Sequence, residues 1–488
     1  MVKPTELVVI GNGMVGHKVL DLLASGDRRR DFHLTTFVEE PRLAYDRVNL
    51  TSYFDGKTAD ELSLASAQRY EEAGITAHLG DKAVAIDRAA RTVTSAAGRV
   101  VRYDKLIIAT GSYPFVPAIP GNDATGCFVY RTLDDLTAIE QFAGNGDGNG
   151  NVKIGAVVGG GLLGLEAANA LRRLGLTVHV IEFAPRLMAL QLDEAGGFIL
   201  RRRIEALGVQ VHTGKSTTTI GVDAATGRVA GMAFADGSTL DTDMVVFSAG
   251  IRARDELGRQ AGLSVGPRGG ITIDERCRTS DPDVYAVGEC ALYEGRTYGL
   301  VAPGYQMARA AVADLTGGHE TFTGFDMSTK LKLLGVDVAS FGDGLATTPG
   351  ARVVSLLDGT GDVYKKLVLD AAGKKLLGGI LVGDASRYAQ LAQMVQNQIT
   401  LPPHPEDLIL PTGRAGASVG FGIDALPDAA TICSCHNVDK KTICDAIAND
   451  KLTAVSAIKS CTKAGTGCGS CVTLLSDLLK SSLKRAGV

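Results

Sequence analysis

The chain has 488 residues, of which 45% are hydrophobic and 21% charged, and its net charge is −4. This length exceeds what one hydrophobic core usually serves, so we expect several domains. The mildly acidic balance lacks the basic footprint of proteins that bind nucleic acid or anionic membranes. No segment has the length and apolarity of a membrane span, and the N-terminus lacks the pattern of a signal peptide, so a cytoplasmic location is expected.

The nine cysteines are unevenly distributed, with six of them in the last 56 residues. A set of this size in a long chain is not a disulfide framework. Clustering of thiols in a reducing compartment indicates a metal centre near the C-terminus instead.

The N-terminal residues predict a strand, a glycine turn, a helix and a second strand. The strands cover Leu7–Ile10 and Leu34–Val38, the helix covers Met14–Ala24, and GNGMVG occupies residues 11–16. In G-x-G-x-x-G the first glycine makes the turn, the second lets a pyrophosphate approach the backbone, and the third lets helix and strand pack closely. Glu39 follows the second strand, where an acid meets a ribose hydroxyl. The unit predicts a dinucleotide site, which we assign to FAD.

The same pattern returns in the middle of the chain. A strand at Lys153–Val158 leads into GGGLLG at residues 159–164, a helix over Leu163–Leu174 and a strand at Val178–Ile181. Glu182 ends that strand and favours NADH over NADPH, because an acid repels a 2′-phosphate. Two dinucleotide sites in one chain are typical of a flavoprotein reductase, in which hydride passes from nicotinamide to flavin.

Arg186 lies close to Glu182 in the sequence and weakens the preference for NADH, since a guanidinium could bind a 2′-phosphate. A second basic feature, Arg201–Arg203, lies within an amphipathic helix and is expected to be a solvated face. Between the two dinucleotide units, Gly144–Asn151 has nothing to bury and predicts a surface loop.

The region Phe325–Leu410 predicts a separate α+β domain. Strand patterns cover Leu331–Phe341, Ala351–Leu357 and Val363–Leu369, and a helical pattern covers Tyr388–Asn397. Prolines and then glycines continue to Gly422 and predict a linker.

Three further stretches resemble the two-dinucleotide pyridine nucleotide–disulfide oxidoreductase superfamily. They are IIATG at residues 107–111, FSAGIR at residues 247–252 and DVYAVGEC at residues 283–290. The resemblance covers roughly residues 5–320. In the family an Asp usually stands at the position of Glu289, where it holds the ribityl chain of the flavin.

The resemblance implies the site residues. Glu166 is expected near the nicotinamide, Arg47 and Leu50 are expected near the flavin ring, and Glu166 and Arg47 are the expected catalytic residues. The expected FAD contacts are Gly11, Gly13, Met14, Gly16, Glu39, Arg47, Val84, Ala109, Thr110, Gly111, Gly288 and Glu289. The expected NAD contacts are Gly159, Gly161, Leu162, Leu163, Gly164, Glu182 and Gly250.

One departure from the family concerns cysteine. Disulfide reductases carry a C-x4-C pair soon after the first dinucleotide unit, and related peroxidases and oxidases carry one cysteine there. The stretch Arg42–Phe54 contains no cysteine. Dithiol chemistry and thiol-based peroxide reduction are therefore not expected, and electrons must leave the flavin by another route.

Four C-terminal cysteines supply that route. Cys433 and Cys435 form one close pair, and Cys468 and Cys471 form another. Four thiolates in two pairs bind either an iron–sulfur cluster or structural zinc. The spacing resembles the bacterioferritin-associated-ferredoxin-like [2Fe–2S] fold, which favours the cluster, with zinc as the alternative and Cys461 as an alternative ligand.

The whole chain resembles the N-terminal part of the large subunit of bacterial NAD(P)H-dependent assimilatory nitrite reductases. The matching stretches are GNGMVGH at residues 11–17, EEPRLAYDR at 39–47, LKLLGVDV at 331–338 and CTKAGTGC at 461–468. That family continues into a sirohaem and [4Fe–4S] half with a further four-cysteine set. This chain has no such set, so by itself it is not expected to reduce nitrite.

We therefore predict an α/β protein with two Rossmann-like three-layer nucleotide-binding domains, an α+β domain and a small helical [2Fe–2S] domain. The predicted boundaries are 1–126 with 253–322 for FAD, 127–252 for NAD(P)H, 323–412 for the α+β interface domain, 413–430 for a linker and 431–488 for the cluster. The predicted function is an NADH-dependent electron-transfer reductase. Its expected acceptor is a sirohaem/[4Fe–4S] nitrite reductase module or a nitrate reductase catalytic subunit.

Two other functions remain open. The first is a reductase for rubredoxin or ferredoxin-type carriers, and the second is a zinc-containing redox or nucleotide sensor. A homodimer is also considered.

Overall fold

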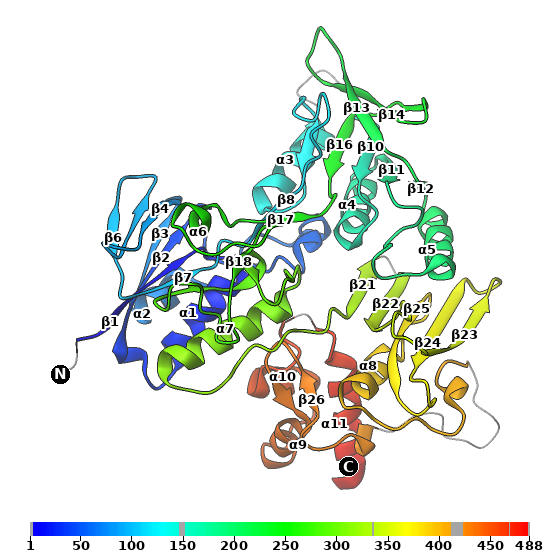
Figure 1. Cartoon of the computed structure of the whole chain (residues 1–488). Coiled ribbons are helices and arrows are strands. Elements are labelled where there is room, and N and C mark those ends of the chain that lie inside the picture. Colours follow the sequence, from blue (N-terminus) through cyan, green and yellow to red (C-terminus); the bar gives the residue numbers. More distant parts are fainter. Residues whose placement is uncertain (1–2, 146–151, 334–335, 411–422, 468, 487–488) are drawn as a thin grey trace. The chain divides into compact units, whose positions relative to one another are not determined.

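The computed structural model describes residues 3–145, 152–333, 336–410, 423–467 and 469–486 (Figure 1). The chain divides into two compact units. The first unit comprises Met1–Phe115, Arg131–Leu133 and Ile251–Phe325, and the second comprises Val116–Tyr130, Asp134–Gly250 and Asp326–Val488. None of the described helices is long and apolar enough to cross a membrane.

The first unit is built on a five-stranded parallel sheet in the order β19-β7-β1-β2-β3. Its strands are Val284–Ala286 (β19), Lys105–Ile108 (β7), Thr5–Ile10 (β1), Phe32–Val38 (β2) and Ile75–Leu79 (β3). The last four residues of β1 are fully buried, as the apolar run predicts for a strand covered on both faces. Helix α1 (Met14–Ser25) packs against β1 and against α7 (Val301–Thr316).

Smaller elements complete the first unit. They are α2 (Ala67–Glu72), β4 (Ala83–Asp87), β5 (Thr92–Ser95), β6 (Val100–Arg102), β8 (Ser112–Pro114), β17 (Ile251–Ala253), α6 (Glu256–Gln260), β18 (Ile271–Thr272) and β20 (Ala291–Leu292). Strands β4, β5 and β6 form an antiparallel sheet, and β8 pairs antiparallel with β17.

The second unit begins with another five-stranded parallel sheet, in the order β12-β11-β10-β16-β9. Its strands are Val209–Thr213 (β12), Thr177–Glu182 (β11), Ile154–Val158 (β10), Met244–Phe247 (β16) and Cys127–Val129 (β9). Its helices are α3 (Leu133–Asn145), α4 (Leu162–Arg173) and α5 (Glu194–Ala206), and β13 (Thr217–Val222), β14 (Val229–Phe234) and β15 (Thr239–Leu240) form a small antiparallel sheet. Both predicted dinucleotide units are therefore confirmed as parallel α/β structure.

The loop predicted at Gly144–Asn151 starts too early. Helix α3 continues through Asn145, because the apolar spacing of its earlier turns carries the helix past Gly144. The rest of the predicted loop lies outside the described residues.

A third five-stranded sheet is antiparallel, in the order β21-β22-β25-β24-β23. Its strands are Thr329–Leu333 (β21), Val336–Gly342 (β22), Leu376–Val382 (β25), Val363–Leu369 (β24) and Arg352–Asp358 (β23), and α8 (Tyr388–Gln396) packs against β25 and β22.

Two features of this antiparallel sheet differ from the strand patterns in the sequence. The single pattern over Leu331–Phe341 is a pair of antiparallel strands, with Leu333 opposite Val336, because the alternation continues through both. Strand β25 was not predicted, since Gly378 and Gly379 interrupt its apolar run. A Cβ on Gly378 would lie 2.3 Å from the backbone nitrogen of Asp343, so the close approach of β22 requires glycine there.

Helix α5 joins the second parallel sheet to the antiparallel one, because it packs against both β24 and β25. Arg203 donates from Nε to the carbonyl of Asp362 at 2.8 Å, and Arg202 forms an ion pair with Asp362 at 3.2 Å. The prediction that Arg201–Arg203 is a solvated face is therefore wrong for Arg203, which is half-buried, whereas Arg202 is exposed although it pairs with Asp362. The turn between β23 and β24 brings its carbonyl and carboxylate oxygens to these guanidinium groups.

Asp193 makes a second set of polar contacts between α5 and the antiparallel sheet. Its Oδ1 caps α5 by accepting from the backbone of Gly196 at 3.0 Å. Its Oδ2 accepts from Tyr364 Oη at 2.8 Å and from Lys366 Nζ at 3.0 Å. Lys366 is only 7% exposed, so its ammonium depends on Asp193 for neutralisation.

The C-terminal part of the second unit is small and helical, as predicted. It contains β26 (Thr431–Cys433), β27 (Val438–Asp439), α9 (Lys440–Asn449), α10 (Val455–Thr462) and α11 (Val472–Ala486). The buried Gln393 of α8 donates from Nε2 to the carbonyl of Thr431 at 2.8 Å.

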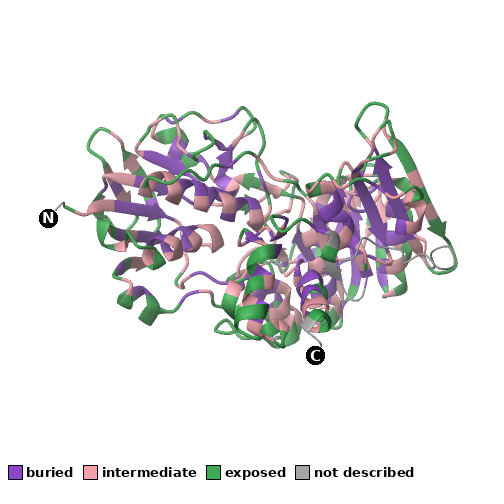
Figure 2. Cartoon of the chain, turned by 90° about the horizontal axis from the view of Figure 1, so that it is seen from below, coloured by how far each residue is buried: buried purple, intermediate pink, exposed green. Residues whose placement is uncertain are grey.

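In Figure 2 the buried residues gather in the central strands of each unit, and exposed residues mark the loops and outer helix surfaces.

We predict that Asp193→Ala lowers the free energy of unfolding by roughly 3 kcal/mol, because it removes the cap of α5 and leaves Lys366 buried without a counter-charge. Urea unfolding followed by circular dichroism measures the change. Asp193→Asn keeps the cap oxygen and should lose less. An alanine variant as stable as the parent chain would show that this joint contributes nothing.

Candidate functional site

The first glycine turn has the shape of a pyrophosphate cradle. Gly11 has φ +103°, and a Cβ there would lie 2.4 Å from the carbonyl oxygen of Ala109. A Cβ on Gly16 would lie 2.0 Å from the carbonyl oxygen of Gly11. Gly13 has no neighbouring atom within 4 Å of its Cβ position. The first and third glycines are thus required by packing, while the second faces open space that a pyrophosphate would fill.

The helices after both glycine turns begin without a side-chain cap. In the described chain Gly13 is the N-cap of α1 and Gly161 is the N-cap of α4, and neither position has a capping hydrogen bond from a side chain. The first-turn N–H groups and the positive end of each helix dipole therefore remain for an anion.

Asn12, which the sequence analysis did not single out, fixes the chain beside the first turn. Its side chain is 5% exposed, its Oδ1 accepts from the backbone of Ala44 at 3.0 Å, and its Nδ2 donates to Tyr70 Oη at 2.8 Å. His17 Nδ1 lies 2.9 Å from the same hydroxyl. Burial raises the pKa of Tyr70 to about 12, so the hydroxyl stays protonated. The one hint in the sequence was the position of Asn12, a polar residue between the first two glycines of the motif.

Glu39 directly follows β2, and its predicted contact with a ribose hydroxyl stays a prediction. It forms ion pairs with Arg254 and, at 3.3 Å, with Lys82. Burial alone would favour the protonated acid, but these two cations outweigh it and lower the pKa of Glu39. Val84 is 42% exposed, and its predicted contact with FAD stays a prediction. Arg254 was not predicted, because it is distant in the sequence.

Arg47 is held on the segment that the family resemblance places near the flavin ring. It pairs with Glu40 and its guanidinium lies over the ring of Tyr45, 5.0 Å from the centroid. Tyr45 donates from Oη to Glu40 Oε2 at 2.8 Å. Burial raises the pKa of Tyr45 well above its usual value. Leu50, from the same segment, is buried.

Hydrogen bonds and an ion pair hold the segments that carry Thr110 and Glu289 in place. Ser112 Oγ donates to Glu289 Oε2 at 2.7 Å, and Arg131 pairs with the same carboxylate. Thr110 Oγ1 donates to the carbonyl of Arg254 at 2.6 Å. The carboxylate of Glu289 thus has two partners, Ser112 and Arg131, and neither was predicted.

Two glycines next to these strand ends adopt positive φ angles. Gly111 has φ +73° and Gly288 has φ +80°. A Cβ on Gly288 would lie 3.3 Å from Val15 in α1. The backbone at both positions therefore needs glycine.

The second glycine turn repeats the first in detail. A Cβ on Gly159 would lie 2.2 Å from the carbonyl oxygen of Ser248, and one on Gly164 would lie 1.9 Å from that of Gly159. Gly161 and Gly250 have no neighbouring atom within 4 Å of their Cβ positions. The residues of this turn fit a second pyrophosphate in the same way. Leu162 and Leu163 open α4 and are half-buried.

Glu182 is tied to the second turn. Its Oε2 accepts from the backbone of Gly160 at 2.6 Å, and its Oε1 accepts from the backbone of Ala184 at 2.6 Å. Arg186 donates from Nε to the carbonyl of Leu192 at 2.8 Å and lies with Nη2 3.4 Å from the carbonyl of Ala189. The acid therefore faces the dinucleotide turn, whereas the guanidinium is engaged by its own loop.

Glu166 lies in α4 and is half-buried. Its predicted place near the nicotinamide, like the predicted roles of the other dinucleotide contacts, stays a prediction.

The two cysteine loops lie together. Cys433, Cys435 and Cys471 are 3%, 2% and 7% exposed, and Cys468 lies outside the described residues. Gly467, which precedes Cys468, would place a Cβ 3.2 Å from Cys435 Sγ. The soft thiolate set fits a [2Fe–2S] cluster. No three His, Cys, Asp or Glu side chains among the described residues form a metal-binding group, so the four-cysteine ligand set stays a prediction.

The other cysteines have ordinary environments. Cys461 is exposed and its Sγ lies 3.3 Å from Asp450 Oδ2. Cys444 is half-buried. Cys277 and Cys290 are fully buried, as structural cysteines usually are.

Three protein-family models match successive parts of the chain. The pyridine nucleotide-disulphide oxidoreductase model matches residues 5–314. The chain belongs to this family. The rubredoxin NAD⁺ reductase C-terminal domain model matches residues 328–399, and the BFD-like [2Fe–2S] binding domain model matches residues 431–481. The protein is an NAD(P)H-dependent flavoprotein oxidoreductase whose cofactors are FAD, NAD(P)H and a [2Fe–2S] cluster.

Known relatives extend the similarity over the whole chain. The chain is 53% identical to the nitrite reductase [NAD(P)H] large subunit of Klebsiella oxytoca, covering 100% of this chain and 50% of that protein. It is 35% identical to the assimilatory nitrate reductase electron transfer subunit of Bacillus subtilis, covering 98% of this chain and 60% of that protein. The chain thus spans about half the length of the curated relatives it matches.

A solved structure supports the same fold. The ferredoxin reductase from Rhodopseudomonas palustris has a TM-score of 0.72 and 26% identity, and the match covers 83% of this chain and 96% of that one. The predicted α/β fold with a C-terminal [2Fe–2S] domain is confirmed.

We predict that Gly16→Ala and Gly164→Ala have separable effects. Each Cβ would force a backbone shift of more than 1 Å, which costs roughly a hundredfold in kcat/KM for NADH. Gly16→Ala should also lose the flavin absorbance, whereas Gly164→Ala should keep it and lose ADP-ribose binding by calorimetry. Gly359→Ala, with nothing within 4 Å of its Cβ, is the control. Loss of both ligands in both variants would mean general misfolding.

Proposed function

We propose that this chain oxidises NADH and delivers single electrons to a nitrite-reducing sirohaem and [4Fe–4S] centre, or to a nitrate reductase subunit, on another segment or partner. The observation that carries the proposal is the union, in one chain, of two dinucleotide turns with a pair of adjoining cysteine loops. FAD accepts two electrons as hydride, and a [2Fe–2S] cluster passes one electron at a time. The sequence Arg42–Phe54 has no cysteine to take the electrons instead.

The residues of the chain would bind the two dinucleotides and orient them. The turns at Gly13 and Gly161 offer helix N-termini to the two pyrophosphates. Glu39 and Glu182 would accept from ribose hydroxyls. Arg47, fixed by Glu40 and Tyr45, brings a cation of fixed orientation to the segment expected near the flavin ring.

NADH is the proposed electron donor rather than NADPH. The carboxylate of Glu182 lies on the glycine turn, where a 2′-phosphate would meet a like charge. Arg186, the residue that could have reversed this preference, donates to carbonyls of its own loop.

Nitrite or nitrate reduction is favoured over carrier reduction by the extent of the similarity. The relatives named for nitrite and nitrate reduction match across 98% or more of this chain. A nitric oxide reductase FlRd-NAD⁺ reductase from Vibrio vulnificus is 29% identical over only 69% of the chain. The homodimer stays a prediction.

We predict that Glu182→Gln lowers the ratio of kcat/KM for NADH to that for NADPH by about tenfold, because it removes one repulsive charge while keeping an acceptor for the turn. Steady-state kinetics with both donors measures the ratio. Arg186→Gln is the matched control and should leave the NADPH value unchanged. A weaker NADPH reaction in that control would place Arg186 on the 2′-phosphate.

The decisive experiment is an anaerobic titration with NADH followed by visible spectroscopy. We expect flavin bleaching with about one equivalent, followed by loss of the iron–sulfur absorbance with about half an equivalent. Electron paramagnetic resonance should then detect the reduced cluster. Zinc on the cysteines, with flavin bleaching alone, would contradict the proposal and favour the sensor.

A further inference from the structure

The C-terminal domain has a charge opposite to that of the whole chain. Residues 431–488 contain seven lysines and one arginine against four aspartates and no glutamate, a net charge of +4, whereas the chain as a whole carries −4. From Lys451 to Ser476 there are three lysines and no acidic residue, and Cys468 and Cys471 lie within this stretch. The excess positive charge is thus concentrated in the sequence that carries the second cysteine pair.

Lys463 is joined directly to the cysteine loops. It ends α10 in a left-handed conformation with φ +63°, and its carbonyl accepts from Thr466 Oγ1 at 2.7 Å. The same hydroxyl lies 3.0 Å from Nε2 of His436, the residue after Cys435. Through Thr466 the backbone of the exposed Lys463 is therefore linked to His436, which follows the buried Cys435.

Lys459 lies over the same loop, with its Cε 3.2 Å from the Cβ position of Gly465. Among the described residues, neither Lys459 nor Lys463 forms an ion pair, whereas Lys441 of α9 pairs with Asp445 at 2.5 Å. Asp450, the acid closest in sequence to this stretch, accepts from Cys461 Sγ at 3.3 Å. We call Lys459 and Lys463 the cluster-side lysines.

We propose that the cluster-side lysines form the docking surface for the electron acceptor, and that the acceptor presents an acidic face to them. The inference rests on the proposed function in one respect, namely that electrons leave the chain through the cluster. An uncompensated positive surface next to a redox centre steers an acidic partner and speeds its encounter. Each encounter moves one electron from the reduced cluster to an oxidised metal of the acceptor, and no atom or proton is exchanged.

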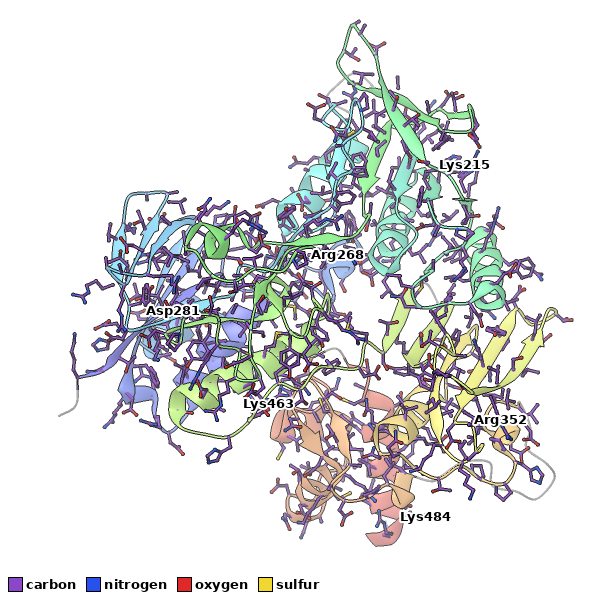
Figure 3. The ribbon with its side chains drawn as sticks, in the orientation of Figure 1. Lys215, Arg268, Asp281, Arg352, Lys463 and Lys484 are labelled. Atoms are coloured by element: carbon purple, nitrogen blue, oxygen red, sulfur yellow. The ribbon has the colours of Figure 1, made fainter. Side chains whose placement is uncertain are left out.

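The test compares two one-electron acceptor proteins of opposite charge, an acidic rubredoxin and the basic cytochrome c. The NADH-reduced protein is mixed with each in a stopped-flow instrument, and the oxidation of the cluster is followed between low and high ionic strength. The double variant Lys459→Glu/Lys463→Glu is compared with Lys480→Glu/Lys484→Glu, which reverses two exposed charges on α11. Figure 3 labels Lys463 and Lys484 on different sides of the domain.

We expect rubredoxin to react faster at low salt, and the cluster-side variant to lower that rate about tenfold while raising the rate with cytochrome c. The α11 variant should behave like the parent chain. Equal effects of both variants would overturn the inference, because they would report only total charge. If the cluster-side variant slows reduction of the cluster by NADH instead, the surface belongs to the flavoprotein part of the chain and the inference is wrong.

Failure of the proposed function is recognised separately. If NADH does not reduce the cluster, the electron route through FAD fails. The same comparison is then made on dithionite-reduced protein, where the acceptor rates still decide whether the cluster-side lysines dock an acidic partner.

Discussion

The close approach of backbone to backbone at the two glycine turns is the constraint on which the rest depends. The Cβ positions of Gly16 and Gly164 lie 2.0 Å and 1.9 Å from carbonyl oxygens, so each helix can begin beside its strand only when the side chain is absent. That approach leaves Gly13 and Gly161 facing open space at a helix N-terminus. Packing and anion binding are therefore met by the same few atoms.

Around each glycine turn, polar contacts hold in place the backbone and side-chain groups that a dinucleotide would contact. Asn12 secures the Ala44 backbone to the first turn, and Glu182 secures its own carboxylate to the second. These contacts hold acceptors and cations in place before any ligand arrives, which reduces the entropy lost on binding. One of these contacts is fully buried, because Asn12 also donates to the hydroxyl of Tyr70 in the interior.

Within the second unit, buried polar joints connect elements that belong to different sheets and domains. Asp193 links α5 to the antiparallel sheet through Lys366, and Gln393 links α8 to the strand that ends at Cys433. Such joints specify one arrangement, because a misplaced partner would leave a buried polar group without its bond.

The sequence by itself determined both dinucleotide turns, the acids Glu39 and Glu182, and the cysteine pairs, because these depend on steric and chemical demands within a few adjacent residues. It also predicted the parallel strands β1, β2, β10 and β11, whose apolar runs reflect burial on both faces. It did not reveal strands β3, β9, β12 and β25, the roles of Arg131 and Arg254, or the pairing of Arg203. Arg131 and Glu289 are 158 residues apart, and Arg203 and Asp362 are 159 apart. Contacts of that range exist only after the chain has folded, so only the tertiary structure decided them.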